Sequence, residues 1–179
     1  MKAKSSPNVL RITVLAMLAA LAVAVGLFKF PLFPAASFLE FDFADVPILL
    51  ATLLYGPIPG LAALFTVSAI QAFFLGGNGI IGFLMHFIAS GAVVVLFGIV
   101  CRNKKSAARL TVSSVCGTLL MTALMVPINY IAIPLLFGAP REMVTDFLPF
   151  IIPFNLIKAG VNTALASVCW FPANKALSR

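Results

Sequence analysis

An apolar segment near the C-terminus carries three polar residues, Asn155, Lys158 and Asn162, at spacings of three and four. On a helix they lie within roughly 60° of one another and form one polar stripe. An amide both donates and accepts hydrogen bonds, and an ammonium only donates. The stripe could therefore hold a ligand that has carbonyl groups beside an N–H. Lys158 lies about 12 Å from the nearer end of the segment, so we expect the stripe to face a polar cavity.

Three other apolar segments each contain a polar side chain at a similar predicted depth, namely Gln71, His86 and Asn129. Asn129 and Gln71 either join helices by hydrogen bonds, as is common in membrane bundles, or line the same cavity. His86 is either a packed neutral histidine or a cavity residue. Because the chain has one His and no metal-type Cys spacing, the sequence predicts no metal site.

Three acidic residues, Glu40, Asp42 and Asp45, follow the first apolar segment. One interpretation is a solvated loop in which Asp45, two positions before Pro47, caps a helix. The other connects the acids with the cavity, because a buried ammonium needs a partner. Glu40 or Asp42 is the predicted partner of Lys158.

The composition decides what kind of fold must position these groups. Of 179 residues, 62% are hydrophobic and 9% are charged, and the mean hydropathy is +1.13. A soluble domain has roughly 45–50% apolar and about 25% charged residues. The composition excludes a soluble enzyme, a disordered chain and a disulfide-rich secreted domain. It predicts an all-α membrane protein.

We expect six transmembrane helices in a single domain, residues 1–179, over about 9–27, 46–55, 61–75, 80–101, 110–137 and 150–170. The first run also fits a signal peptide, but it is long for one and no small-residue cleavage site follows it. The sequence GPIPG at 56–60 predicts a tight turn, and residues 138–149 predict a loop.

The distribution of Lys and Arg predicts the orientation. With both termini cytoplasmic, nine basic residues lie inside, namely Lys2, Lys4, Arg11, Arg102, Lys104, Lys105, Arg109, Lys175 and Arg179. Only Lys29 and Arg141 lie in outer loops, and all five acids lie on the outer side. The net charge of +7 therefore reflects topology, and we expect no nucleic-acid partner.

Small residues recur every four positions in the first predicted helix, at Ala16, Ala20 and Ala24. Such spacing lets another helix approach closely. The approaching helix could belong to this chain or to a partner.

Several segments carry a resemblance to a known family. They are FLEFDF at 38–43 with DVP at 45–47, NGIIG at 78–82 and, most specifically, PFNLIK at 153–158. The chain resembles the substrate-binding (S) components of energy-coupling factor (ECF) vitamin transporters, above all the riboflavin-specific members of the RibU type. The chain has no G-x-x-x-x-G-K-[ST] phosphate loop, so another subunit would have to supply the energy.

The resemblance implies a six-helix S-component fold that binds riboflavin with high affinity in a cavity open to the outside, under the first loop. It implies that the protein is not an enzyme, has no cofactor and lies in a prokaryotic plasma membrane. The implied partners are a transmembrane coupling subunit, which the alanine face would contact, and two cytosolic ATPase subunits. Asn129, Asn155 and Lys158 match the ligand-contacting positions of the family.

The residues alone leave other functions open. Similar groups could hold pantothenate or another carbonyl-bearing vitamin. A small membrane enzyme would need paired carboxylates or a His–carboxylate cluster at one interface. A structural or chaperone-like membrane subunit would bind no ligand.

Overall fold

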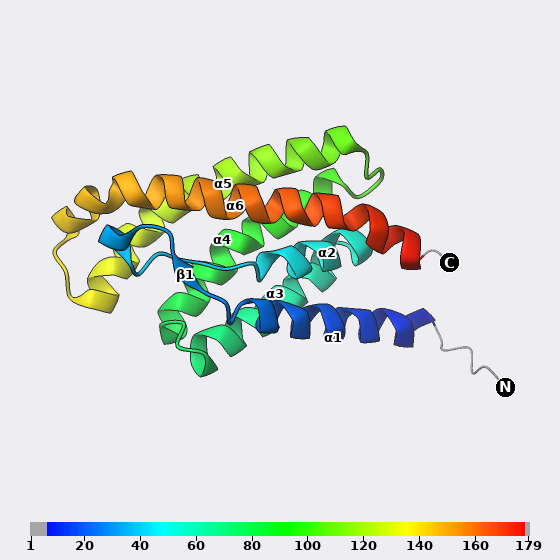
Figure 1. Cartoon of the computed structure of the whole chain (residues 1–179), viewed down its shortest axis with the longest axis horizontal. Helices are drawn as coiled ribbons and strands as arrows, with labels where there is room; N and C mark the ends of the chain where they lie inside the picture. The colour runs from blue at the N-terminus through cyan, green and yellow to red at the C-terminus, as the bar shows by residue number, and fades with distance from the viewer. Residues whose placement is uncertain (1–6, 178–179) are drawn as a thin grey trace.

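The computed structural model describes residues 7–177, which form six α-helices (Figure 1). Lys2, Lys4 and Arg179, which are predicted to lie on the cytoplasmic side, are outside the described residues. The elements in chain order are α1 (Pro7–Val25), β1 (Phe30–Pro31), the 3-10 helix η1 (Pro34–Ala36), β2 (Glu40–Phe41), α2 (Asp45–Tyr55), α3 (Pro57–Phe74), α4 (Gly79–Val100), α5 (Ala107–Phe137) and α6 (Arg141–Leu177). The predicted all-α fold with six helices is confirmed.

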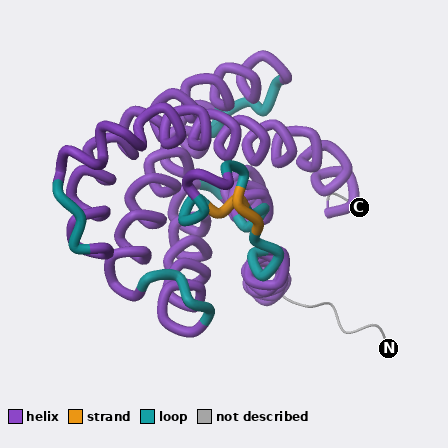
Figure 2. The backbone as a smooth tube through the Cα atoms, turned by 60° about the vertical axis from the view of Figure 1, so that its left-hand side comes forward, coloured by secondary structure: helices purple, strands orange, loops and turns teal. Residues whose placement is uncertain are grey.

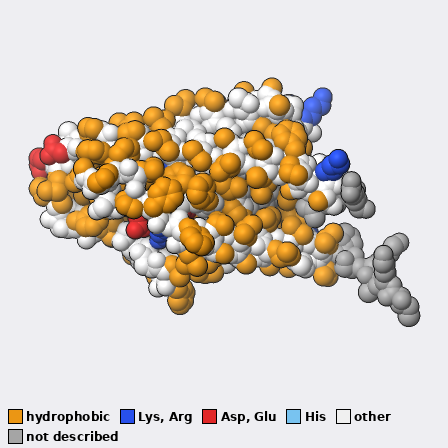
Figure 3. All heavy atoms as spheres, in the orientation of Figure 1, with side chains coloured by type: hydrophobic (Ala, Val, Ile, Leu, Met, Phe, Trp, Pro, Cys, Tyr) orange, Lys and Arg blue, Asp and Glu red, His pale blue; other side chains and the backbone are white. Residues whose placement is uncertain are grey.

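Five of these helices are long and apolar enough to cross a membrane, and α2 is shorter. With 11 residues, α2 spans about 16 Å, roughly half of a bilayer core of about 30 Å. Hydrophobic side chains cover most of the face drawn in Figure 3, and the acidic and basic side chains at its two ends are separated. This surface suits a lipid environment.

Two predicted boundaries are wrong. Of the expected turn at 56–60, only Gly56, with φ +96°, leaves the helical path, and α3 begins at Pro57. Proline is well placed there because a first-turn residue needs no N–H partner. Likewise α6 begins at Arg141 instead of near 150 and continues to Leu177, so most of the expected loop is helical. Pro149 and Pro153 lie inside this helix.

The helix α2 lies at the centre of the bundle and contacts α1, α3, α4 and α6. Leu53, Leu64, Val94 and Phe97 are fully buried around it. In Figure 1, both chain ends lie on the right-hand side, and the long helices α5 and α6 run side by side. We call the half with the chain ends the terminal half, and the opposite half the cavity half.

Residues 28–44, here called the cover segment, cross the cavity half between α1 and α2. Their two short strands pair antiparallel, with Phe30 opposite Phe41, and Figure 2 shows these strands against the helices. Phe38 packs edge-on against Phe147, with ring centroids 5.2 Å apart, and Phe33 contacts Phe150 at 5.7 Å. Aromatic contacts therefore hold the cover segment against α6.

Candidate functional site

A cavity of about 200 Å³ lies between the cover segment and helices α3, α4, α5 and α6. Of the residues predicted from sequence, its lining includes Glu40, Asp42, Gln71, His86, Asn129, Asn155 and Lys158. The fold thus brings seven polar residues from five segments to one cavity. Apolar side chains such as Met125 and Phe154 complete the wall.

The strongest polar contact in the cavity joins α6 to the cover segment. Lys158 Nζ lies 2.8 Å from Asp42 Oδ2 and 3.5 Å from the Glu40 carbonyl oxygen. The Glu40 carboxylate instead lies 3.7 Å from Lys29 Nζ. The expectation of an acidic partner for Lys158 is confirmed for Asp42 and is wrong for the Glu40 side chain.

Asp42 lies in the cover segment, outside the helices. Burial opposes its ionisation, but the Lys158 ammonium and its hydrogen bond, together with His86 and the Ala44 N–H, hold the pKa of the Asp42 carboxyl below its usual value. The carboxylate also accepts a hydrogen bond from the Ala44 N–H at 2.9 Å. The ionised pair therefore fixes the end of the cover segment on α6.

Asn162 does not line the cavity, contrary to the prediction from the stripe. It is buried one turn deeper, where its amide donates to the Asp42 carbonyl oxygen at 3.0 Å. Its side-chain oxygen is buried without a hydrogen-bond partner in the described chain, and Asn162 lines a void of about 10 Å³ together with Asp45, Ser90 and Thr163. The cover segment lies over the Asn162 end of the polar stripe and separates Asn162 from the cavity. Asn162 therefore positions Asp42 and does not line the cavity.

Two of the amides that line the cavity, Asn129 and Asn155, donate hydrogen bonds to carbonyl oxygens of their own helices. Asn129 donates to the Met125 carbonyl at 2.7 Å, and Asn155 donates to the Ile151 carbonyl at 2.8 Å. Of the side chains that line the cavity, those of Asn155 and Gln71 each have a buried atom, Oδ1 and Nε2, with no hydrogen-bond partner in the described chain. An unsatisfied buried polar group costs about 1–3 kcal/mol. A ligand with both donors and acceptors would relieve this cost.

His86 lines the cavity, but both of its ring nitrogens contact protein side chains. Nε2 lies 3.1 Å from Asp45 Oδ1, and Nδ1 lies 3.0 Å from Ser68 Oγ. Asp45 also accepts from Ser90 Oγ at 3.1 Å. The predicted cap is wrong, because no side chain caps α2 and Asp45 is its first residue. The network ties α2, α3 and α4 together behind the cavity.

Sequence reasoning missed Ser68 and Ser90. Serine is common in apolar helices, so neither stood out among the other residues. The available signals are spacings: Ser90 follows His86 by four positions and Ser68 precedes Gln71 by three, so each serine shares a helix face with a polar residue already singled out.

The alanine face lies on the outside of the bundle. Ala16, Ala20 and Ala24 are exposed, whereas Ala22 is fully buried against the core. The three alanine side chains therefore lie on the surface of the described chain and not in its core.

Comparison with known proteins matches this architecture. A family model described as ECF transporter, substrate-specific component, matches residues 10–169. The chain belongs to this family. The S component is 31% identical to the riboflavin transporter FmnP of Bacillus subtilis, over 90% of each chain. It is 27% identical to the riboflavin transporter RibU of Streptococcus thermophilus, over 95% of this chain and 85% of the relative.

A solved structure shares the fold. It is the S component of a bacterial ECF transporter, with a TM-score of 0.84 and 28% identity over 96% of this chain and 99% of that one. The S component is therefore a membrane transport subunit that works with other ECF components, and not an enzyme.

Proposed function

We propose that this S component binds riboflavin in the cavity under the cover segment and delivers it for ATP-dependent uptake. The observation that carries the proposal is the balance of charge in the cavity. Its two cations, Lys29 and Lys158, are each paired with an acid, Glu40 and Asp42. The riboflavin transporters among its relatives support the same ligand.

A charge-balanced lining favours a neutral ligand, because an anion would have to compete with Asp42 or Glu40 for a cation. Pantothenate carries a carboxylate and flavin mononucleotide carries a phosphate. A phosphate favours several donors and free cations, which the described cavity lining does not offer. Riboflavin is therefore the main expected ligand, and flavin mononucleotide a weaker one.

One edge of the flavin ring has two carbonyls and an N–H. These groups can form hydrogen bonds with the unpaired amide atoms of Asn155 and Gln71. We assign Asn129, Asn155, Lys158 and Gln71 to this edge, and Glu40 and Asp42 to the ribityl hydroxyls. His86, which lines the cavity but is held by Asp45 and Ser68, and Asn162, which lies outside the lining, act as positioning residues. Drug-sized sites measure roughly 300–1,000 Å³, so a tricyclic ligand requires the cover segment, including Phe38 and Leu39, to move outward.

The proposed partners are a transmembrane coupling subunit and two cytosolic ATPase subunits, in a prokaryotic plasma membrane. Family membership supports the partnership with ECF components in general. The exposed Ala16, Ala20 and Ala24 offer a close-approach surface for a helix of the coupling subunit.

The test is purification of the full chain in detergent from rich medium, followed by a visible absorption spectrum. Flavin bands near one equivalent per chain are expected. Protein without bound ligand is then titrated with riboflavin, flavin mononucleotide and pantothenate. A colourless protein that fails to quench riboflavin fluorescence would refute the proposal, and tight pantothenate binding would assign the other vitamin.

A further inference from the structure

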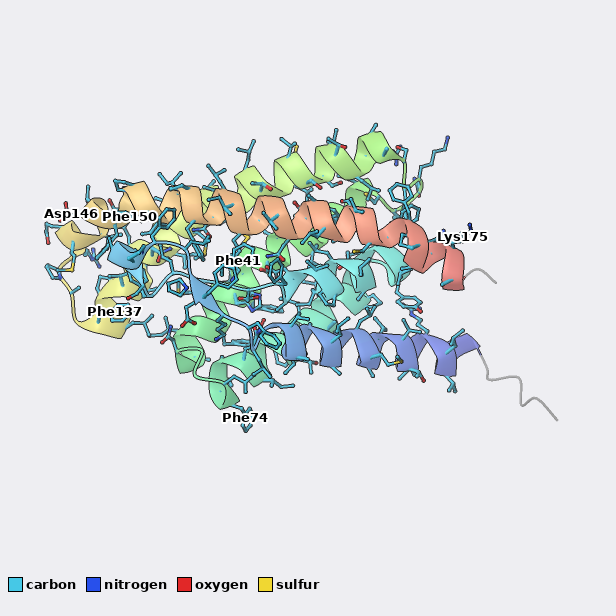
Figure 4. The ribbon with its side chains drawn as sticks, viewed as in Figure 1. Phe41, Phe74, Phe137, Asp146, Phe150 and Lys175 are labelled. Atoms are coloured by element: carbon cyan, nitrogen blue, oxygen red, sulfur yellow. The ribbon has the colours of Figure 1, made fainter. Side chains whose placement is uncertain are left out.

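A second cavity lies in the terminal half of the bundle, away from the proposed vitamin site. It measures about 620 Å³ and is bounded by α1, the junction of α2 and α3, and the end of α4 with its following loop. Arg11, Arg102 and Lys105 line it, and no acidic residue does. Lys175, labelled in Figure 4, marks this half of the molecule, and Asp146 marks the opposite end.

The cations of this cavity are not neutralised within the described chain. Arg11 is held in place by Tyr55, with Nη2 3.5 Å from the Tyr55 carbonyl oxygen and the guanidinium 5.6 Å from the ring centroid. Arg102 and Lys105 have no salt-bridge partner within residues 7–177. By contrast, Arg109, from the same basic cluster, donates to the Val100 carbonyl at 3.2 Å and does not line the cavity.

The start of α3 adds positive potential. Gly56, Pro57, Ile58 and Pro59 all line the cavity, and no side chain caps this helix start. Pro57 and Pro59 have no N–H and the Gly56 N–H bonds the Thr52 carbonyl, so among these four residues Ile58 alone can donate a backbone hydrogen bond to an anion. The helix start also carries a partial positive charge, which favours anions. Three side-chain cations and a helix start therefore converge on one hollow.

The walls of the cavity decide which anion suits it. Ile58 is 79% exposed and Ile99 is 65% exposed, and both line the cavity. A free anion gains nothing from such apolar walls, whereas a lipid can place its acyl chain along them. Basic pockets between membrane helices on the cytoplasmic side are known to suit anionic headgroups.

We propose that this cavity binds the phosphate headgroup of an anionic phospholipid, with Arg11, Arg102 and Lys105 as its ligands. The site does not depend on the riboflavin proposal, because no residue lines both cavities. A general excess of cytoplasmic charge would instead attract lipid equally through Lys104 and Lys175, which lie outside the cavity lining.

The experiment is native mass spectrometry of the full chain in detergent, with phosphatidylglycerol or phosphatidylcholine added. We expect a bound phosphatidylglycerol and no comparable phosphatidylcholine. Arg102→Gln with Lys105→Gln should weaken phosphatidylglycerol binding about 30-fold, since each basic residue near a membrane surface contributes about fivefold. The matched control, Lys104→Gln with Lys175→Gln, removes the same charge and should retain the lipid.

Four results would overturn the proposal. They are equal loss of lipid in both double variants, equal binding of phosphatidylcholine, displacement of the lipid by millimolar inorganic phosphate, and loss of the lipid on assembly with the coupling subunit. The third would indicate a free-anion site, and the fourth a protein interface. Riboflavin titration of each variant checks the fold and tests the vitamin site separately.

Discussion

In the cavity half, α6 meets the cover segment through an ion pair and amide hydrogen bonds, as in Lys158 with Asp42 and Asn162 with the Asp42 carbonyl. In the terminal half, helices meet through glycines. A Cβ at Gly60 would lie 2.0 Å from Thr52 Oγ1, and one at Gly98 would lie 2.4 Å from Pro57 Cβ. Polar groups thus join the cover segment to α6 in the first half, and close backbone approach at glycines joins α2, α3 and α4 in the second.

The two kinds of contact indicate different roles, namely ligand binding for the polar contacts and support of the fold for the glycine contacts. Polar groups inside a membrane are costly and are tolerated where they serve a cavity or a partner. Small residues let helices associate without polar groups. Substitutions of residues that line the cavity should therefore change ligand affinity, and substitutions at the closely packed glycines should change stability.

The largest effect on binding is expected from Lys158→Ala. It removes the ammonium from the cavity and leaves Asp42 buried without its partner, so we expect riboflavin affinity to fall about 100-fold and the melting temperature to fall as well. Lys175→Ala, on the same helix but exposed at its end, is the control. Fluorescence titration and thermal unfolding measure both quantities.

A double variant separates the two proposed roles of Lys158, which are contact with the ligand and pairing with Asp42. Asp42→Asn combined with Lys158→Met removes both charges, so stability should recover relative to Lys158→Ala while riboflavin affinity stays low. Recovery of affinity would show that Lys158 acts only on Asp42 and does not contact the ligand.

Asn155→Ala should weaken riboflavin binding about tenfold with little change in melting temperature, because the amide lines the cavity. Asn162→Ala, two turns along the same helix, should do the reverse, because it leaves the Asp42 carbonyl without its donor. Titration and unfolding of both variants test the contrast. The same profile for both would remove the distinction between a cavity residue and a positioning residue.

Gly98→Ala should destabilise the bundle by about 1–3 kcal/mol without changing the riboflavin affinity of the folded protein. Its Cβ would meet Pro57 backbone at 2.9 Å. Gly91→Ala is a matched control on α4, since its nearest atoms lie at 3.7 Å. Unfolding should show a loss only for Gly98, and equal losses would contradict tight packing at the α3–α4 contact.

The pH dependence follows from Asp42, whose pKa is held below its usual value by Lys158. At pH values above the ordinary carboxyl pKa of about 4, Asp42 is ionised and its pairing with Lys158 stabilises the closed cover segment. This stabilisation is lost as the pH falls through the lowered pKa of Asp42. Riboflavin affinity should therefore stay constant from about pH 8 to about pH 5. A fall within that range would contradict the assignment of the pH dependence to Asp42.

The smallest effect on binding is expected from Ala20→Leu, which should leave riboflavin affinity unchanged. It should reduce uptake in cells, because a bulky side chain blocks close approach of a partner helix to α1. Ile12→Leu is the control, since it keeps a large exposed residue on α1. Normal uptake with Ala20→Leu would remove the proposed coupling role of the alanine face.

Much of the site could be predicted because a polar residue stands out in an apolar segment. Asn129, Asn155 and Lys158 were found in this way, and all three line the cavity. Asn162 has the same helical spacing, but it lies under the cover segment and not in the cavity lining. The spacing of residues along α6 gives no information about the path of the cover segment. Ser68 could not be predicted from its residue type, because serine is common in apolar helices, and its contact with His86 is visible only in the structure.

The sequence by itself determined the all-α fold, the membrane character and the positions of most helices, because hydropathy and turn residues act locally along the chain. Only the tertiary structure decided that Lys158 pairs with Asp42 and not with the Glu40 carboxylate, and that His86 is held by Asp45 and Ser68. Such pairs join residues that are far apart in the sequence. Their distances depend on how the cover segment and the helices pack, which no local pattern specifies.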